Sequence, residues 1–152
     1  MKKIILLISL YAISFQTYAW RESHGGNSTA SEFISVTMTL MNDILFMERD
    51  DNIIVTDLYS TLANNVEETR VISEDKLVIR GMEFEAINYI AKDGTKWIKI
   101  SDKKWKGLSM ESKERLILHE YLSLAGLEET GKYFISTRLY EDIRKYRAKL
   151  QY

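Results

Sequence analysis

The sequence predicts an α+β domain with N-terminal helices, a three- to four-stranded antiparallel meander, and then two or three C-terminal helices. Three observations predict it. Apolar residues recur at helical spacing near both ends of the chain, apolar and charged residues alternate in the middle, and Asp93-Gly94 supplies a hairpin turn. With 152 residues, 45% of them hydrophobic and 28% charged, the chain is long enough to build one core.

Residues 1–19 are interpreted as a cleaved secretory signal peptide. Lys2 and Lys3 precede an apolar run, and Thr17-Tyr18-Ala19 places small residues at both positions that a signal peptidase recognises. A transmembrane anchor is the competing interpretation, but the run is short and interrupted by polar residues. We therefore expect a periplasmic or secreted protein with no transmembrane segment in the mature chain.

Residues 20–31 are polar and carry two glycines without periodicity, which predicts a flexible mature N-terminus before a single domain over residues 32–152. His24 lies in this segment, where a solvated tail histidine is a more common role than a mobile metal ligand. The chain contains no cysteine, which excludes a disulfide framework, a lipoprotein anchor and a cysteine-based zinc site.

Two helices are predicted before the strands. The first begins at Ser28, Thr29 or Ser31 and ends near residues 49–52. Its apolar stripe consists of Phe33, Val36, Leu40, Met41, Ile44 and Met47. The second helix runs from about Val55 to Ala63 and stops at Asn64-Asn65, although the β-branched residues 53–55 are also compatible with a strand.

The periodicity changes after Val66. Residues 69–73 and 77–79 are short β-type runs, and residues 82–90 form a longer run that alternates apolar with charged side chains at its start. Residues 96–100 are expected to form the next strand after the Asp93-Gly94 turn. The alternation implies one solvated and one packed face.

Two or three helices are expected after the strands. Ser101-Asp102 is expected to cap a short helix that carries Trp105, and Ser109 is expected to cap the next one. Gly126 is expected to end that helix in the left-handed conformation, with Leu127 as the accompanying apolar contact. Residues 128–133 are predicted to form a loop. Ser136 or Thr137 is expected to cap the last helix, whose apolar stripe is Leu139, Ile143, Tyr146 and Leu150.

Charge is distributed unevenly along the chain. Residues 20–75 contain 3 basic and 11 acidic side chains, whereas residues 76–152 contain 16 basic and 11 acidic ones. The basic C-terminal half is suited to an anionic envelope component such as a cell-wall polymer or lipid head groups. The alternative is that the two halves pack together and neutralise each other. No nucleic-acid partner is expected, because the basic residues of the last helix match its dipole.

The segment around His119 is the one constellation that suggests chemistry. His119 and Ser123 are four residues apart on the helical face opposite the broadest apolar arc, so His119 is expected to be exposed. In a His-Glu-x-x-His helix, two histidines at this spacing bind zinc and the glutamate polarises the bound water. Here the candidate ligands are His119 and Glu129, with Glu120 as the catalytic base. A set of two ligands favours a structural role for this helix.

The line His119-Glu120-x-x-Ser123-x-x-Gly126-x-x-Glu129 resembles the zinc-binding helix of the metzincin peptidases, a branch of the zincins, with two of the three histidines replaced. The stretch from Gly81 to Tyr140 also resembles a group of small, secreted, uncharacterised proteins of Gram-negative bacteria, including predatory ones. The residues that carry this second resemblance are Gly81, Glu83, Ala86, Asn88, Trp105, the Leu-His-Glu-Tyr-Leu run, Gly126, Tyr133 and Ser136. It implies export and a shared α+β domain, without an established activity.

Together these observations predict an exported, non-catalytic binding or accessory protein of the cell envelope that needs no cofactor. The alternative is a peptidase-like, zinc-dependent hydrolase that uses His119, Glu120 and Glu129.

Overall fold

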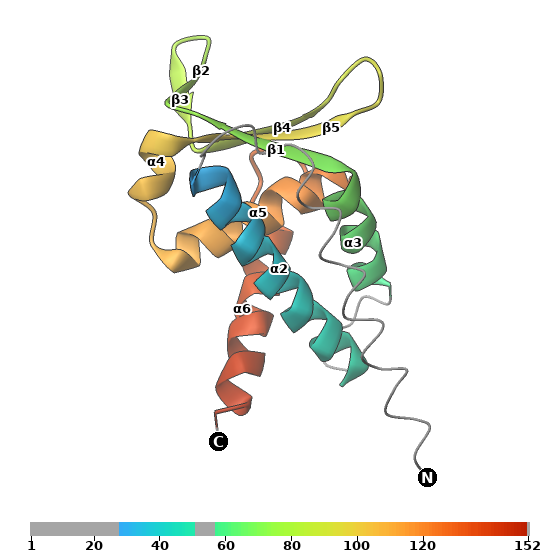
Figure 1. Cartoon of the computed structure of the whole chain (residues 1–152). Helices are drawn as coiled ribbons and strands as arrows, with labels where there is room; N and C mark the ends of the chain where they lie inside the picture. The colour runs from blue at the N-terminus through green and yellow to red at the C-terminus, as the bar shows by residue number, and fades with distance from the viewer. Residues whose placement is uncertain (1–27, 51–56, 152) are drawn as a thin grey trace, which may run out of the picture.

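The computed structural model describes residues 28–50 and 57–151, and these residues form an α+β fold (Figure 1). The α+β class predicted from the sequence is confirmed. The elements follow in the order α2 (Ser28–Arg49), α3 (Leu58–Glu68), β1 (Thr69–Glu74), β2 (Leu77–Ile79), β3 (Met82–Phe84), β4 (Ala86–Ile90), β5 (Lys96–Ser101), α4 (Asp102–Lys106), α5 (Met110–Leu124) and α6 (Phe134–Lys149).

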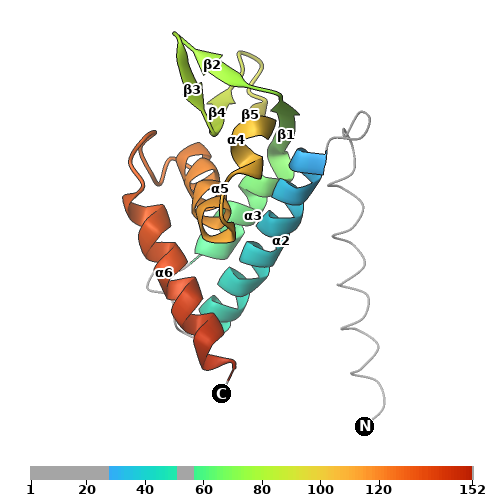
Figure 2. The same ribbon diagram turned by 90° about the vertical axis from the view of Figure 1, so that its left-hand side faces the viewer.

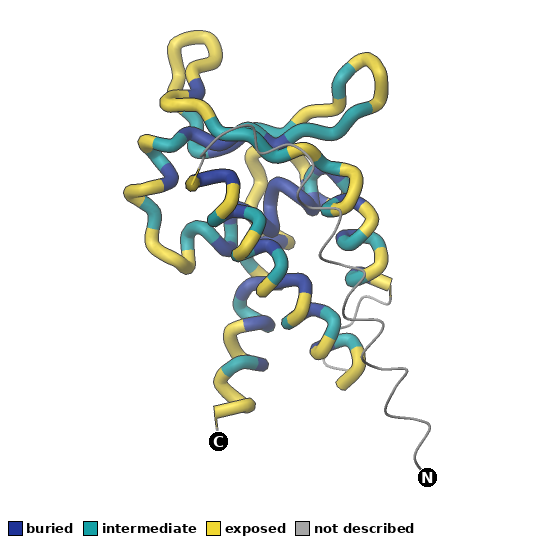
Figure 3. The backbone as a smooth tube through the Cα atoms, in the orientation of Figure 1, coloured by how far each residue is buried: buried dark blue, intermediate teal, exposed yellow. Residues whose placement is uncertain are grey.

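The described helices lie on one side of a three-stranded sheet, and the core lies between the two layers (Figures 1 and 2). On the inner face of the sheet, Ile98 and Ile100 are buried against the helices. The ring of Trp105 packs on that of Phe33, with 5.5 Å between their centroids. Figure 3 shows buried residues along α5 and on parts of α2 and α6, whereas much of the sheet is of intermediate exposure. The opposite face of the sheet carries none of these helices.

The predicted antiparallel meander is wrong in its pairing. The sheet order is β1-β5-β4, in which β4 and β5 are antiparallel but β1 runs parallel to β5, with Val71 opposite Ile98. The Asp93-Gly94 turn does join β4 to β5, and Gly94 has a φ of +85°. The sequence pattern predicts strands but not their partners, because any strand with one apolar face can pair on either side.

The run over residues 82–90, expected as one continuous strand, is divided between two sheets. β3 pairs with β2 as a separate hairpin, and β4 joins the main sheet after a break at Glu85. Arg80 and Gly81 both have positive φ values, 52° and 81°, as the central residues of a two-residue hairpin turn of type I′ do. The antiparallel pairing of β2 with β3 agrees with the predicted meander, but the turn itself was not recognised, because arginine is not one of the residues that usually occupy its first position.

The N-terminal boundaries also differ from the predictions. α2 starts at Ser28, which is one of the three predicted start positions but lies within residues 20–31, the segment that was expected to be flexible. α3 continues four residues beyond Asn64, because Asn65 is satisfied inside the helix: its side-chain amide donates to the Thr61 carbonyl at 2.9 Å and accepts from Lys96 Nζ at 2.9 Å. The predicted signal peptide, His24 and the start predicted for the second helix lie outside the described residues. No described helix is long and apolar enough to cross a membrane.

Three predicted helix ends are confirmed. The hydroxyls of Ser101 and Ser109 accept hydrogen bonds from the main chain of α4 and α5, respectively. Gly126 has a φ of +72°, and its N–H donates to the Ser123 carbonyl while that of Leu127 donates to the Leu122 carbonyl. This pair of bonds is a Schellman motif, which closes the C-terminus of α5.

Ion pairs join the acidic N-terminal half to the basic C-terminal half. Arg147 on α6 binds Asp43 on α2 at 2.7 Å and the buried Glu114 on α5 at 2.8 Å. Three further pairs cross between the halves: Lys113 with Glu32, Lys96 with Glu68, and Lys99 with Glu74. Part of the charge asymmetry seen in the sequence is therefore used in packing.

Candidate functional site

The His-Glu segment lies in the buried part of α5. His119 is 2% exposed and Glu120 is 3% exposed, so the expectation that His119 faces solvent is wrong. The physical reason is the segment over residues 125–133, which folds back over the helix. It brings the Tyr133 ring onto the His119 ring, with 3.9 Å between the centroids and 23° between the planes.

His119 is bonded to Glu128, whose carboxylate organises the start of α6. His119 Nδ1 lies 2.8 Å from Glu128 Oε2. The other carboxylate oxygen accepts hydrogen bonds from the main-chain N–H groups of Ile135 and of Ser136, the latter at 2.9 Å. α6 begins at Phe134, so the predicted cap by Ser136 or Thr137 is wrong. A side chain from outside the helix satisfies its first free N–H groups instead.

These contacts set the charge state of Glu128. Burial by itself would raise its pKa, but the hydrogen bonds from Ser136, His119 and Ile135 together outweigh burial and lower the pKa of Glu128 below its usual value. The partially positive N-terminus of α6 acts in the same direction. Glu128 is therefore a buried carboxylate that the fold holds in its ionised form.

Glu120 occupies the opposite kind of environment. Its carboxylate accepts one hydrogen bond, at 2.6 Å, from the side-chain amide of Asn88 on β4. Burial raises the pKa of Glu120, and the bond from Asn88 and the proximity of His119 only partly offset this effect. Two buried carboxylates around one histidine thus have pKa values shifted in opposite directions, which is a pattern found at catalytic sites and also in structural networks.

The third residue predicted for the zinc site lies elsewhere. The Glu129 side chain is 74% exposed and pairs with Lys132 in the same loop. His119 is joined to Glu128 instead of Glu129. Within residues 28–50 and 57–151, no group of three His, Cys, Asp or Glu side chains is arranged to hold a metal ion.

An open groove of about 380 Å³ adjoins the buried cluster. Tyr133 belongs to both, because its ring stacks on His119 and its side chain also lines the groove. Burial and the nearby carboxylates of Glu120, Glu85 and Glu128 raise the pKa of Tyr133 to about 12. The groove is lined by Glu85, Leu108, Ser112, Arg115, Leu116, Tyr133 and Thr137. This lining offers a protonated hydroxyl, both charges and an apolar floor to a small ligand.

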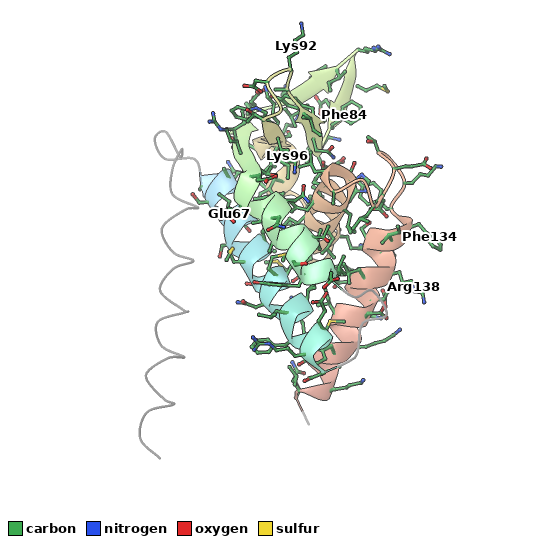
Figure 4. The ribbon with its side chains drawn as sticks, turned by 90° about the vertical axis from the view of Figure 1, so that its right-hand side faces the viewer. Glu67, Phe84, Lys92, Lys96, Phe134 and Arg138 are labelled. Atoms are coloured by element: carbon green, nitrogen blue, oxygen red, sulfur yellow. The ribbon has the colours of Figure 1, made fainter. Side chains whose placement is uncertain are left out.

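Phe134, the first residue of α6, follows Tyr133 in the chain and is 76% exposed. Figure 4 shows it projecting away from the first turn of α6. Phe134 is a surface residue and does not belong to the buried cluster.

Sequence reasoning did not predict Asn88, Glu128 or Tyr133 as members of this cluster. Glu128 immediately precedes the residue that the zinc-binding pattern selects, and its role depends on where α6 begins. Asn88 is an uncharged polar residue in an otherwise apolar strand, which was the one available signal of a buried partner.

Comparison with protein-family models, curated protein sequences and solved structures found no match to this chain.

Proposed function

We propose that this is an exported, non-catalytic binding or accessory protein of the cell envelope. The observation that carries the proposal is that each residue of the zinc-like pattern has a partner within the fold. His119 bonds to Glu128, Glu120 bonds to Asn88, and Glu129 pairs with Lys132.

These bonds compete with the binding of a zinc ion by the same side chains. A zinc ion at His119 would have to displace the Glu128 contact, which also joins α5 to the start of α6. A catalytic base must reach a water molecule and a substrate, whereas the Glu120 carboxylate is enclosed between α5 and β4. The cluster is better suited to fixing the positions of β4, α5 and α6 relative to one another.

Export is part of the proposal and rests on the sequence of residues 1–19. The envelope ligand is expected to include an anionic component that meets the basic C-terminal half. The ion pairs between the halves neutralise some of these cations, so the attraction is expected to be weak and sensitive to salt.

Metal analysis of the protein purified after export tests the non-catalytic part. After incubation with excess zinc and desalting, the proposal expects no stoichiometric zinc. One zinc per chain would overturn it in favour of the zinc-dependent hydrolase. Glu129→Ala is the informative variant, because this exposed residue can be removed without disturbing the core, and loss of zinc from it would assign Glu129 as a ligand.

Retention on isolated cell envelopes tests the binding part. The protein is expected to be retained at low salt and released as the salt concentration rises, on envelopes and on anionic lipid vesicles. A protein that passes through both unretained would contradict a binding function at the envelope.

A further inference from the structure

The groove beside Tyr133 carries polar groups that the fold does not use. Tyr133 and Thr137 both line the groove, and neither hydroxyl makes a hydrogen bond within residues 28–50 and 57–151. In the adjoining buried cluster, by contrast, His119 and Glu120 are both bonded to other side chains. The groove therefore has hydrogen-bonding capacity that is available to a ligand.

One end of the groove is negatively charged. Glu85 lines it and lies close enough to the Tyr133 hydroxyl to raise its pKa, as the two buried carboxylates of the cluster also do. The Lys104 ammonium is 3.5 Å from the Glu85 carboxylate, which is longer than a hydrogen bond of about 2.9 Å. The Glu85 carboxylate can therefore accept a hydrogen bond from a ligand, and the nearby negative charge favours a cationic donor.

The wall formed by α5 and α6 is positively charged. Arg115 on α5 faces α6, because its guanidinium carbon lies 6.0 Å from the centroid of the Tyr140 ring. Thr137 lies about one turn before Tyr140 on α6 and lines the groove with Arg115. The guanidinium is 3.5 Å from the Glu111 carboxylate and donates no hydrogen bond to another described residue. Arg115 and Thr137 therefore offer N–H and O–H donors to a carboxylate.

The geometry of α5 separates the two charged regions. Arg115 precedes His119 by four residues, which corresponds to about 6 Å along the helix axis. The Tyr133 ring is stacked on His119 and so marks the negative end. Two residues of extended chain span about 7 Å, whereas one spans about 3.5 Å. The separation therefore matches the two termini of a dipeptide better than the two charges of one amino acid.

The rest of the groove is apolar. Leu108 and Leu116 supply this part of the lining, and Leu116 belongs to the buried core. The volume of about 380 Å³ lies within the range of about 300–1,000 Å³ that is usual for sites that bind small molecules. An apolar side chain of a ligand can be removed from water here while its charged groups remain at the two charged regions.

We propose that this groove binds an apolar dipeptide with free termini. The ammonium group of the ligand binds at Glu85 and Tyr133. Its carboxylate binds at Arg115 and Thr137, and an apolar side chain packs on Leu116. The inference rests on the proposed function, because it names a ligand class for a non-catalytic binding protein.

Calorimetry on the whole exported protein tests the inference, with alanyl-leucine as the probe. Saturable binding is expected. Two blocked forms of the probe examine its ends separately: N-acetyl-alanyl-leucine lacks the ammonium group, and alanyl-leucine amide lacks the carboxylate. Each blocked form is expected to bind at least about tenfold more weakly than the free dipeptide, because a hydrogen bond between charged groups is lost.

Two substitutions assign the ends of the groove. Glu85→Gln should lose the preference for the free over the acetylated dipeptide and keep the preference over the amide. Arg115→Gln should show the reverse pattern. A purely structural effect would weaken all three ligands alike, so the crossed pattern is specific to direct contact. Arg138→Gln is the matched control and should leave all three affinities unchanged, because Arg138 neighbours Thr137 but projects outward and does not line the groove (Figure 4).

Three results would overturn the inference. They are absence of alanyl-leucine binding, equal affinity for the free and the blocked dipeptides, and equal weakening by Arg138→Gln and Arg115→Gln. If the dipeptide does not bind but isolated envelopes still retain the protein, the inference fails and the proposed function stands. If neither binds, both fail.

Discussion

The two faces of the small sheet use polar and aromatic side chains in opposite ways. On the inner face, Asn88 bonds to Glu120, and the neighbouring His119 and Glu128 satisfy each other, so these side chains hold the layers together. On the outer face, Tyr89 and Trp97 order each other without a covering helix among the described residues. The difference teaches that the polar residues of the zinc-like pattern have their partners inside the fold, whereas the aromatic residues one position away along the strands lie on a face that no described helix covers.

Among the substitutions that test this difference, Glu128→Ala has the largest expected effect on the free energy of unfolding. It removes the acceptor of His119 and of two main-chain N–H groups of α6, and should lower the free energy of unfolding by about 3 kcal/mol. Urea unfolding measures the loss. Glu129→Ala is the control and should change stability by less than about 0.5 kcal/mol, since exposed ion pairs contribute little. Equal losses in the two variants would refute the structural role of Glu128.

Glu120→Gln and Glu128→Gln should change the pH dependence of stability in opposite directions, with smaller effects because both keep the side-chain volume. The pKa of Glu128 is lowered by folding, so its stabilisation is full above the unfolded pKa and is lost as the pH falls through the folded pKa. The pKa of Glu120 is raised by folding, so its buried charge costs stability until the pH falls through the folded pKa.

Unfolding free energies measured from about pH 3 to about pH 7 check these signs. Relative to the wild type, Glu128→Gln should lose less stability on acidification, and Glu120→Gln should lose more. The same sign in both variants would show that the two carboxylates do not occupy the different environments described above.

Gly126→Ala should destabilise the protein by about 1 kcal/mol, because its φ of +72° is unfavourable for any residue with a Cβ. No atom lies within 4 Å of the added Cβ, so a steric clash does not contribute. Gly107→Ala is the matched control. Gly107 also follows a helix, but its φ is −86°, and the substitution should be neutral or slightly stabilising. An unchanged melting temperature for Gly126→Ala would contradict the cap.

Tyr89→Ala should have the smallest effect on stability, about 0.5 kcal/mol, because it removes only the stacking of a partly exposed ring on Trp97. Thermal unfolding followed by circular dichroism measures this loss. A large destabilisation would remove the contrast between the faces, because Tyr89 would then serve the fold as Asn88 does.

Local chemistry explains which features could be predicted from the sequence. The caps at Ser101 and Ser109, the turn at Gly94 and the left-handed Gly126 depend on residues close together in the chain, and all are confirmed. The apolar period correctly predicted helix α2 and strand β5. Strand partners could not be predicted in the same way, because β1 and β5 are brought together only when both bury their apolar faces on the same helices.

The same distinction between local features and long-range contacts applies to the candidate site. By itself, the sequence determined that His119 and Glu120 lie on a helix that ends at Gly126, since spacing and a glycine are sufficient for that. Only the tertiary structure decided that His119 is buried, that its partner is Glu128 and not Glu129, and that Tyr89 and Trp97 form one row. The reason is that these contacts join elements that are separate in the chain, and their geometry is set by the packing of the whole core.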